Sequence, residues 1–580
     1  MSYHPHLYSL APFNPFHISS ISHLSLSAGN YAPEDPEEAR PSLDAVRKRF
    51  NNVYMNLAIV EDKRNRNRRV YSLNEFSPDA ILMPDWEVLL VLSPLVNHLS
   101  SDTRDDYFCL FQNNAKTPAK PAGLLPFHHL KTFKCILPNS VRRLRPFYQP
   151  ILTRSLKYWP GNDSESPELL RWNLITYESL STEDDVILFV KGVNQRQGRN
   201  RSPSELRCVF GNDVTNGVRT EVTSSFQEVF RCRRPYEGPL IRLFPRSEEK
   251  IKVTLEVGEE KGVVPSVAYY QSTPQMLIGE EKSLLCACTM VYNVAKFLKE
   301  WVIYHSKLGV EKFILYDNGS DDGLEDVVEE LVQEQYNVKT LFWPWSKTQE
   351  AGFSHCAVYA KDSCTWMMYV DVDEFVYSPS WLSSPYPSNQ MLKSLLPSTS
   401  SSPWSSSEVW IDQLESDRRV GEIMIKCLEF GPSNQSSHPI QGVTQGYTCR
   451  TNGEQRHKSI VLLEAVDESL LNVIHHFQLK EGYRVKALTN EQGVVNHYKY
   501  QAWSEFKAKF RRRVSAYVVD WKQAMNPQSK DRTPGLGFAA IEPQGWANKF
   551  CEVNDSRLKM ATERWFGFNS STGYKMIWQY

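Results

Sequence analysis

The sequence predicts an α/β domain with a Rossmann-like, mostly parallel sheet, preceded by a β-rich, sandwich-like accessory domain. Three observations lead to this prediction. Residues 282–375 alternate between apolar runs typical of buried strands and segments with helical spacing. Residues 46–280 instead contain short β-type runs separated by turn residues. The length of 580 residues also exceeds what a single hydrophobic core supports.

The elements of the α/β domain follow one another without interruption. The predicted strands cover 283–292, 312–316, 338–343 and the run that begins at Trp366, and the predicted helices cover 295–308, 324–335 and 348–363. Gly309 ends the first helix. This alternation predicts a doubly wound sheet with right-handed crossovers, whose ligands bind at the carboxyl ends of the strands.

The fourth predicted strand ends in a group of carboxylates. An apolar run from Trp366 leads directly into Asp371, Asp373 and Glu374. Two carboxylates one residue apart at a strand end can both turn toward a hard cation such as Mg²⁺ or Mn²⁺, which keeps open positions for phosphate oxygens. The alternative for an Asp-x-Asp tripeptide taken alone is a solvated turn.

Asp317 ends the second predicted strand on the same edge. Its carboxylate could accept hydrogen bonds from ribose hydroxyls or a base. The alternative is a local role, as an Asx-turn or as an N-cap of the helix that begins near Leu324.

Composition excludes some classes of function. Lysine and arginine number 66 and Asp and Glu 67, so the net charge of −1 gives no global attraction to nucleic acid or to a membrane. The eleven cysteines lack the spacing of a structural zinc site. Cys208 and Cys232 flank a turn-rich segment and form either a disulfide or two buried thiols.

The N-terminal segment, residues 1–45, contains no apolar run long enough for a signal or a membrane span. We expect it to be disordered or wrongly assigned to the gene. Either the chain is cytosolic, or the gene prediction begins downstream of a targeting segment.

Several spaced motifs together resemble a known family. They are Cys288–Asn293, Glu300–His305, Gly309–Asp317, Gln349–Cys356 and Trp366–Phe375. In this order they resemble a plant member of glycosyltransferase family 92, which includes pectic β-1,4-galactan synthases and related animal galactosyltransferases. The resemblance covers about 282–525. Upstream, Leu82–Val88 and Tyr107–Ala115 also look like plant members, whose N-terminal module is similar to a carbohydrate-binding domain.

This resemblance implies a type A glycosyltransferase fold, a UDP-sugar donor with UDP-galactose preferred, Mn²⁺ (or Mg²⁺) on the Asp-x-Asp, inversion at the anomeric carbon, and a polysaccharide or glycan acceptor. It also implies Golgi residence behind an N-terminal membrane anchor. The sequence lacks that anchor, and a truncated gene prediction is our preferred explanation. No nucleic-acid partner is expected, and the enzyme could form a homodimer.

The resemblance also assigns site residues. Asp371, Asp373 and His497 are the expected metal ligands, with His497 preferred over His475 and His476 because a late histidine commonly ligates the metal in this fold. Expected nucleotide-sugar contacts are Asn293, Asp317 and Lys458, the last neutralising the departing diphosphate. Glu429 is the nominated catalytic base, with Asp467 as the second choice.

The predicted boundaries are 1–45, the accessory domain at 46–280, the transferase domain at 281–555 and a C-terminal tail at 556–580. Two functions from other classes remain open. The chain could be a catalytically silent carbohydrate-binding protein. It could also be a metal-dependent phosphoesterase, although such two-metal sites usually need more His and Asp ligands than the sequence offers.

Overall fold

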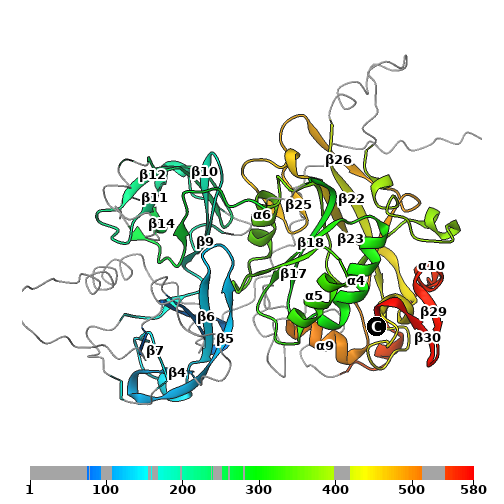
Figure 1. Cartoon of the computed structure of the whole chain (residues 1–580), viewed down its shortest axis with the longest axis horizontal. Helices are drawn as coiled ribbons and strands as arrows, with labels where there is room; N and C mark the ends of the chain where they lie inside the picture. The colour runs from blue at the N-terminus through cyan, green and yellow to red at the C-terminus, as the bar shows by residue number, and fades with distance from the viewer. Residues whose placement is uncertain are drawn as a thin grey trace, which may run out of the picture.

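A computed structural model describes residues 75–76, 79–92, 107–154, 158–159, 167–195, 199–236, 238, 251–258, 262–277, 281–397, 419–512 and 542–579. The predicted N-terminal segment 1–45 lies outside these residues. The described chain is built on three large sheets, and Figure 1 shows two of them on one side of the molecule and the third, with its helices, on the other. None of the helices in the described ranges is both long and apolar enough to cross a membrane.

The first accessory sheet has the strand order β1-β7-β4-β5-β6-β3-β2-β8. Its strands are β1 (Glu75–Phe76), β2 (Asp79–Leu82), β3 (Glu87–Val91), β4 (Tyr107–Leu110), β5 (Lys116–Leu125), β6 (Leu130–Ile136), β7 (Ile151–Thr153) and β8 (Leu170–Arg171). One face of these strands, including Val88, Leu90 and Phe133, packs into a single apolar core. The Cys109–Cys135 disulfide joins β4 to β6 beside it.

The second accessory sheet has the order β15-β14-β11-β12-β13-β10-β9, with β16 paired to β14. Its strands are β9 (Ile175–Ser181), β10 (Asp185–Lys191), β11 (Leu206–Phe210), β12 (Val218–Phe226), β13 (Val229–Arg233), β14 (Ile251–Val257), β15 (Gly262–Val263) and β16 (Tyr269–Tyr270). Cys208 and Cys232 form a disulfide, which decides between the two alternatives left open by the sequence.

The accessory region therefore differs from the predicted single sandwich. Each of its two sheets curls around an apolar core of its own. A sandwich would instead place the inner faces of two sheets against one shared core.

The third sheet begins with the predicted strand and helix alternation. Four parallel strands lie in the order β19-β18-β17-β20. They are β17 (Ser283–Val291), β18 (Lys312–Asp317), β19 (Val338–Phe342) and β20 (Cys364–Tyr369), connected by α4 (Ala295–Leu308), α5 (Leu324–Gln333) and α6 (Gln349–Tyr359). Each element overlaps the range predicted from its apolar spacing.

Beyond β20 the sheet also contains antiparallel pairings, although parallel pairings remain the more frequent kind among its described strands, as predicted. The added strands are β21 (Glu374–Tyr377), β22 (Arg419–Phe430), β23 (Cys449–Leu462), β26 (Tyr483–Ala487), β27 (Val494–His497) and β28 (Val553–Asn554). β23 pairs antiparallel with both β20 and β22, and β27 pairs parallel with β22 and antiparallel with β21. These strands bring residues from 371 to 497 to one end of β20.

The two faces of this sheet bury different partners. On one face Leu285, Phe313 and Met368 pack against α4 and α5. On the other face Cys286, Ile314 and Met367 pack against α6 and against residues of both accessory sheets, among them Leu89, Leu130, Tyr177 and Phe189. Besides its own two cores, the accessory region therefore shares a hydrophobic core with the transferase part.

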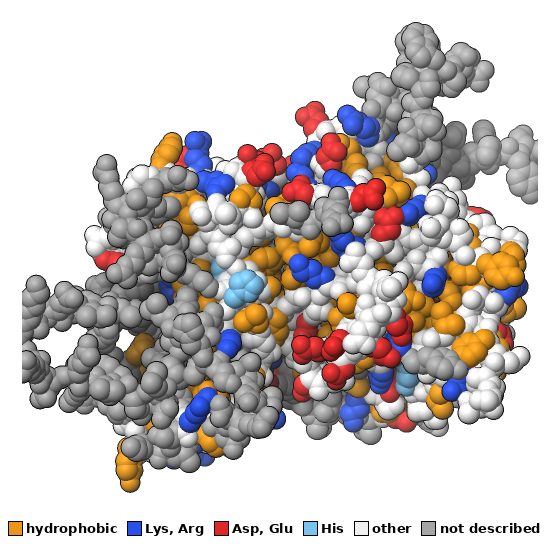
Figure 2. Space-filling view, viewed as in Figure 1, with side chains coloured by type: hydrophobic (Ala, Val, Ile, Leu, Met, Phe, Trp, Pro, Cys, Tyr) orange, Lys and Arg blue, Asp and Glu red, His pale blue; other side chains and the backbone are white. Residues whose placement is uncertain are grey.

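The C-terminal segment was predicted as a tail, and the structure corrects this too. Residues 557–579 form α10 (Arg557–Phe566) and the hairpin of β29 (Gly567–Ser570) and β30 (Gly573–Met576). Leu558, Trp565 and Trp578 are buried in the same core as α4. The outer surface of α5, by contrast, is acidic, and Figure 2 shows acidic side chains gathered where Figure 1 places that helix.

Candidate active site

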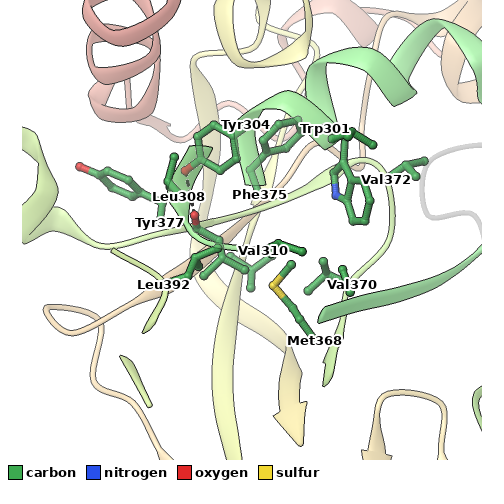
Figure 3. Packing of buried hydrophobic residues seen from close by; sticks show 14 of the residues in the cluster. Trp301, Tyr304, Leu308, Val310, Met368, Val370, Val372, Phe375, Tyr377 and Leu392 are labelled. Carbon is green, nitrogen blue, oxygen red and sulfur yellow. Dashed lines mark hydrogen bonds between the residues drawn. The ribbon is translucent and has the colours of Figure 1, made fainter. Parts of the chain in front are cut away.

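The bend that carries the carboxylates is anchored by its apolar neighbours. Val370, Val372 and Phe375 are buried with Trp301 and Tyr304 of α4, as Figure 3 shows. The indole of Trp301 donates to the Glu374 carbonyl at 3.1 Å, and the Tyr304 hydroxyl donates to the Val376 carbonyl at 2.8 Å. Because these anchors fix the backbone, the intervening carboxylates are held at the strand end.

Asp371 belongs to a charged group centred on Lys458 of β23. Lys458 Nζ lies 3.0 Å from Asp371 Oδ2 and 2.8 Å from Glu374 Oε1. The Asp371 backbone N–H donates to Glu374 Oε2 at 2.8 Å. Burial alone would raise the pKa of Asp371, but Lys458 and His475 together bring it down to about 2. Asp371 is therefore a carboxylate at neutral pH, and its side chain is 32% exposed.

Asp373 faces a second pair of groups. His497 Nε2 lies 3.5 Å from Asp373 Oδ2, and Lys509 of α9 (Trp503–Arg512) forms an ion pair with the same oxygen. Despite burial, Lys509 and His497 hold the pKa of Asp373 well below its usual range. Burial lowers the pKa of His497 to about 4, with Asp373 opposing, so the imidazole is neutral at pH 7.

The three predicted metal ligands supply suitable atoms for Mn²⁺ or Mg²⁺. Two ionised carboxylates and a neutral imidazole are the right donor types, and His497 Nδ1 is buried without a hydrogen bond while lying 3.5 Å from Glu374 Oε1. Asp373 faces His497, whereas Asp371 faces Lys458. Across the described residues, no three His, Cys, Asp or Glu side chains are grouped as a metal site.

The two alternative histidines occupy different surroundings. His475 Nε2 lies 2.6 Å from Lys458 Nζ and 3.7 Å from Asp371 Oδ2, so His475 belongs to the carboxylate site. His476 instead hydrogen bonds to His457 and to the buried Glu422. The structure thus places His475 at the site beside Asp371 and His497 beside Asp373.

The nominated base lies beside His497 in the sheet. Glu429 and His497 are register partners on β22 and β27. The Glu429 carboxylate is buried and receives Lys499 Nζ at 2.5 Å. Asp467, the second choice, accepts a hydrogen bond from the Ser469 backbone N–H at 2.9 Å in a turn. That turn gives Asp467 a local structural role.

Asn293 and Asp317 meet in one loop cluster at the ends of β17 and β18. Asp317 Oδ1 accepts from the Ser320 backbone N–H at 2.9 Å and from its hydroxyl at 2.6 Å. Ser320 Oγ in turn accepts from the Asn293 backbone N–H at 2.9 Å. Asn293 has a φ of 52°, and its amide exchanges hydrogen bonds with Asp321. The local turn expected as the alternative for Asp317 is therefore present.

Three charged residues at the site were not among the predicted site residues. Glu374 accepts from Lys458 and from the Asp371 backbone, Lys509 pairs with Asp373, and Lys499 pairs with Glu429. The sequence signal for Glu374 was its place between Asp373 and the apolar Phe375, because an acid that is buried there needs a cation. The pairings of Lys509 with Asp373 and of Lys499 with Glu429 join residues far apart in sequence, so no local pattern indicates them.

The fold and the site define an α/β protein whose ionised carboxylates, lysines and neutral histidines meet at the carboxyl end of a parallel strand. Comparison with known proteins identifies the family within this class. The profile of glycosyltransferase family 92 matches residues 281–533. The chain belongs to glycosyltransferase family 92, as its motifs had indicated.

Relatives extend the match beyond the profile. A family 92 glycosyltransferase of Arabidopsis thaliana is 44% identical over 72% of this chain and 70% of its own length. One from Ricinus communis is 41% identical over 83% of this chain and 82% of its own. A mannosyltransferase of Pyrobaculum calidifontis, solved with GDP-Man and Mn²⁺, aligns over 42% of this chain and 64% of its own at 10% identity, with a TM-score of 0.23. At that score the alignment supports no argument.

Proposed function

We propose that this glycosyltransferase moves a sugar, galactose in the first instance, from a UDP-sugar to a cell-wall polysaccharide or glycan acceptor, with inversion and with a divalent cation. The observation that carries the proposal is the pair of ionised carboxylates at the end of β20, each with an imidazole beside it. Membership of the family supports glycosyl transfer. The carboxylates could bind a divalent cation that also binds the diphosphate of a nucleotide sugar.

Asp371, Asp373 and His497 would hold Mn²⁺ or Mg²⁺. The bound cation would supply charge neutralisation for the diphosphate as the sugar bond breaks. Lys458 is a second source of positive charge, held 3.0 Å from Asp371. Despite burial, Asp371 and Glu374 raise its pKa above the usual range, so Lys458 stays protonated and can stabilise a departing phosphate.

At the reacting carbon, an inverting transfer needs a group that takes the proton from the acceptor hydroxyl. Glu429 is our candidate for this group because its strand lies in register with His497. The ion pair with Lys499 would have to loosen when acceptor binds, since Lys499 occupies the carboxylate. Loss of transfer in Glu429→Gln, with donor binding intact, would support this role.

We place the enzyme in the Golgi, in the lumen behind a membrane anchor. Ten of the eleven cysteines form five disulfides, and Cys427 is a buried free thiol. Disulfides at this density persist in oxidising compartments such as the secretory pathway and are rare in the cytosol. Localisation of the tagged full-length protein would test this assignment.

The first test of function is UDP release from a panel of UDP-sugars, with and without Mn²⁺, using galactan oligosaccharides as acceptors. Asp373→Asn is the control. Mn²⁺-dependent turnover of UDP-galactose that is lost in the variant is the expected result. Galactan binding without consumption of any donor would instead favour a silent carbohydrate-binding protein.

A further inference from the structure

The β5–β6 hairpin of the first accessory sheet lies against the nucleotide edge of the transferase part, the loop cluster around Asp317. Figure 1 shows this hairpin on the side of its sheet that faces the ten-stranded sheet. A Cβ built on Gly123 of β5 would lie 2.7 Å from the ring of Phe342, the last residue of β19. Glycine at 123 therefore allows the backbone of β5 to touch the end of that strand.

Lys134 of β6 reaches past this contact to the loop after β18. A Cβ built on Gly319 would lie 2.5 Å from Lys134 Nζ, so the ammonium group rests on the backbone of that glycine. Gly319 is two residues beyond Asp317, and it has a φ of 86°. Burial raises the pKa of Asp317, whereas Ser320 and Lys134 oppose that rise. Lys134 of the accessory sheet thus lies close to Asp317 at the end of β18.

Two lysines of this hairpin, Lys120 and Lys134, lie opposite each other. Lys120 of β5 and Lys134 of β6 are direct register partners. Like charges directly opposite each other on neighbouring strands are destabilising. Neither of these two lysines forms an ion pair with a carboxylate of the described residues, although Lys134 acts on Asp317 electrostatically. Lys120 and Lys134, as two neighbouring cations without a paired carboxylate in the part of the chain that the structure describes, favour binding of a ligand rich in hydrogen-bond acceptors.

We propose that Lys134 is a donor-binding residue supplied by the accessory sheet, and that it binds the nucleoside end of the nucleotide sugar. This inference rests on the proposed function. A lysine ammonium has three donors and a carboxylate has only acceptors. Lys134 therefore donates to uracil or ribose oxygens, while Asp317 accepts from ribose hydroxyls. The accessory region would then be one wall of the donor site.

The test compares Lys134→Ala with Lys116→Ala, a matched lysine near the start of β5 where the strand pairs with Leu110. Titration calorimetry gives the affinities for uridine and for UDP, and steady-state kinetics give kcat and KM for the donor. We expect Lys134→Ala to weaken uridine and UDP by the same factor, about tenfold, which is the value of one charge-assisted hydrogen bond. The donor KM rises by that factor and kcat stays within about twofold, as for loss of uniform binding.

Lys134→Arg should restore most of the affinity, and Lys116→Ala should leave every value unchanged. Weaker UDP binding with normal uridine binding would place the cation at the phosphates and overturn the nucleoside assignment. Unchanged affinities, or a fall in thermal stability and kcat with normal affinities, would make Lys134 a structural residue. In either case wild-type turnover of the donor leaves the proposed function standing, whereas absence of UDP binding to the wild type would overturn both.

Discussion

Lys458 and Glu374 form a buried ion pair of 2.8 Å, in which the carboxylate is completely shielded from solvent. Glu374 also accepts the backbone N–H of Asp371, so the pair fixes the turn that presents the carboxylates. Lys458 thus pairs with two acids, the partly exposed Asp371 and the buried Glu374.

Removing one member of this pair should be more harmful than removing both. Burial raises the pKa of Glu374 to about 8 although Lys458 opposes the rise, so Lys458→Met leaves a buried acid that has lost its cation and has to stay protonated. Breaking such a buried pair typically costs about 3–5 kcal/mol. We expect Lys458→Met to lower the free energy of unfolding by that order, and Lys458→Met with Glu374→Gln to recover much of it. Urea unfolding of the two single variants and the double variant measures the coupling. Additive losses would show that the pair does not stabilise the turn.

Lys509 should compete with a divalent cation for Asp373. The two form an ion pair on the oxygen that also faces His497. Lys509→Ala removes the competing charge, so calorimetry at pH 7 should give Mn²⁺ binding several-fold tighter than in the wild type, on the order of the shift expected for one lost charge. Asp373→Asn should abolish binding. Weaker binding in Lys509→Ala would mean that this lysine orients Asp373 rather than blocking it.

Glu300 should make stability depend on pH away from the site. Its carboxylate accepts from the backbone N–H groups of Val443 and Thr444 and from the Thr444 hydroxyl, at 2.7, 3.0 and 2.6 Å. Burial nevertheless raises the pKa of Glu300 from 4.5 to about 7. The folded state therefore holds this proton more tightly than the unfolded state, and its contribution to stability is full below pH 4.5 and lost as the pH rises through about 7.

The measurement is the free energy of unfolding between pH 4 and 8 for the wild type and for Glu300→Gln. Glu300→Gln should be less stable than the wild type at every pH, by about 1–3 kcal/mol, because it loses hydrogen bonds. Its free energy of unfolding should also lack the pH dependence between pH 4.5 and 7 that the Glu300 carboxyl causes in the wild type. Equal slopes in both proteins would contradict the pKa shift of Glu300.

The two disulfides of β17 should stabilise the transferase core. Cys286 is linked to Cys364 at the start of β20, and Cys288 to Cys356 of α6, across 78 and 68 residues of sequence. Cross-links that close loops of this size stabilise by about 4 kcal/mol in the chain-entropy account. We expect Cys288→Ala with Cys356→Ala to lower the unfolding free energy by that order, and Cys427→Ala, which removes the buried free thiol, to have a much smaller effect. Chemical unfolding under non-reducing conditions compares them.

The parallel half of the third sheet could be predicted because its signals are local. A continuous apolar run such as 283–292 predicts a buried strand, and apolar residues at helical spacing predict α4, without any knowledge of the rest of the chain. The carboxylates at the end of β20 followed from the same reasoning, since ligand sites lie at the carboxyl ends of parallel strands.

The rest depends on contacts between residues far apart in sequence. The pairing of Lys458 with Glu374 requires β23 to run antiparallel beside β20, and no local pattern specifies that register. Lys134 lies at the Asp317 loop only because the accessory sheet docks on the transferase part. The disulfide partners are 24–102 residues apart, and spacing alone allows many other pairings.

The hydrophobic core that joins Leu89, Tyr177 and Phe189 to the strands of the third sheet limits where the chain can be truncated. Residues 281–533, which match the family profile, are therefore not expected to fold independently of the accessory strands. Cut free at residue 281, this segment would expose to water the sheet face that the accessory strands cover, and exposed apolar surface of this kind drives aggregation. Residues 557–579 would be missing from the opposite face as well. A protein that keeps the described accessory strands and residues 557–579 retains the apolar contacts on both faces of this sheet.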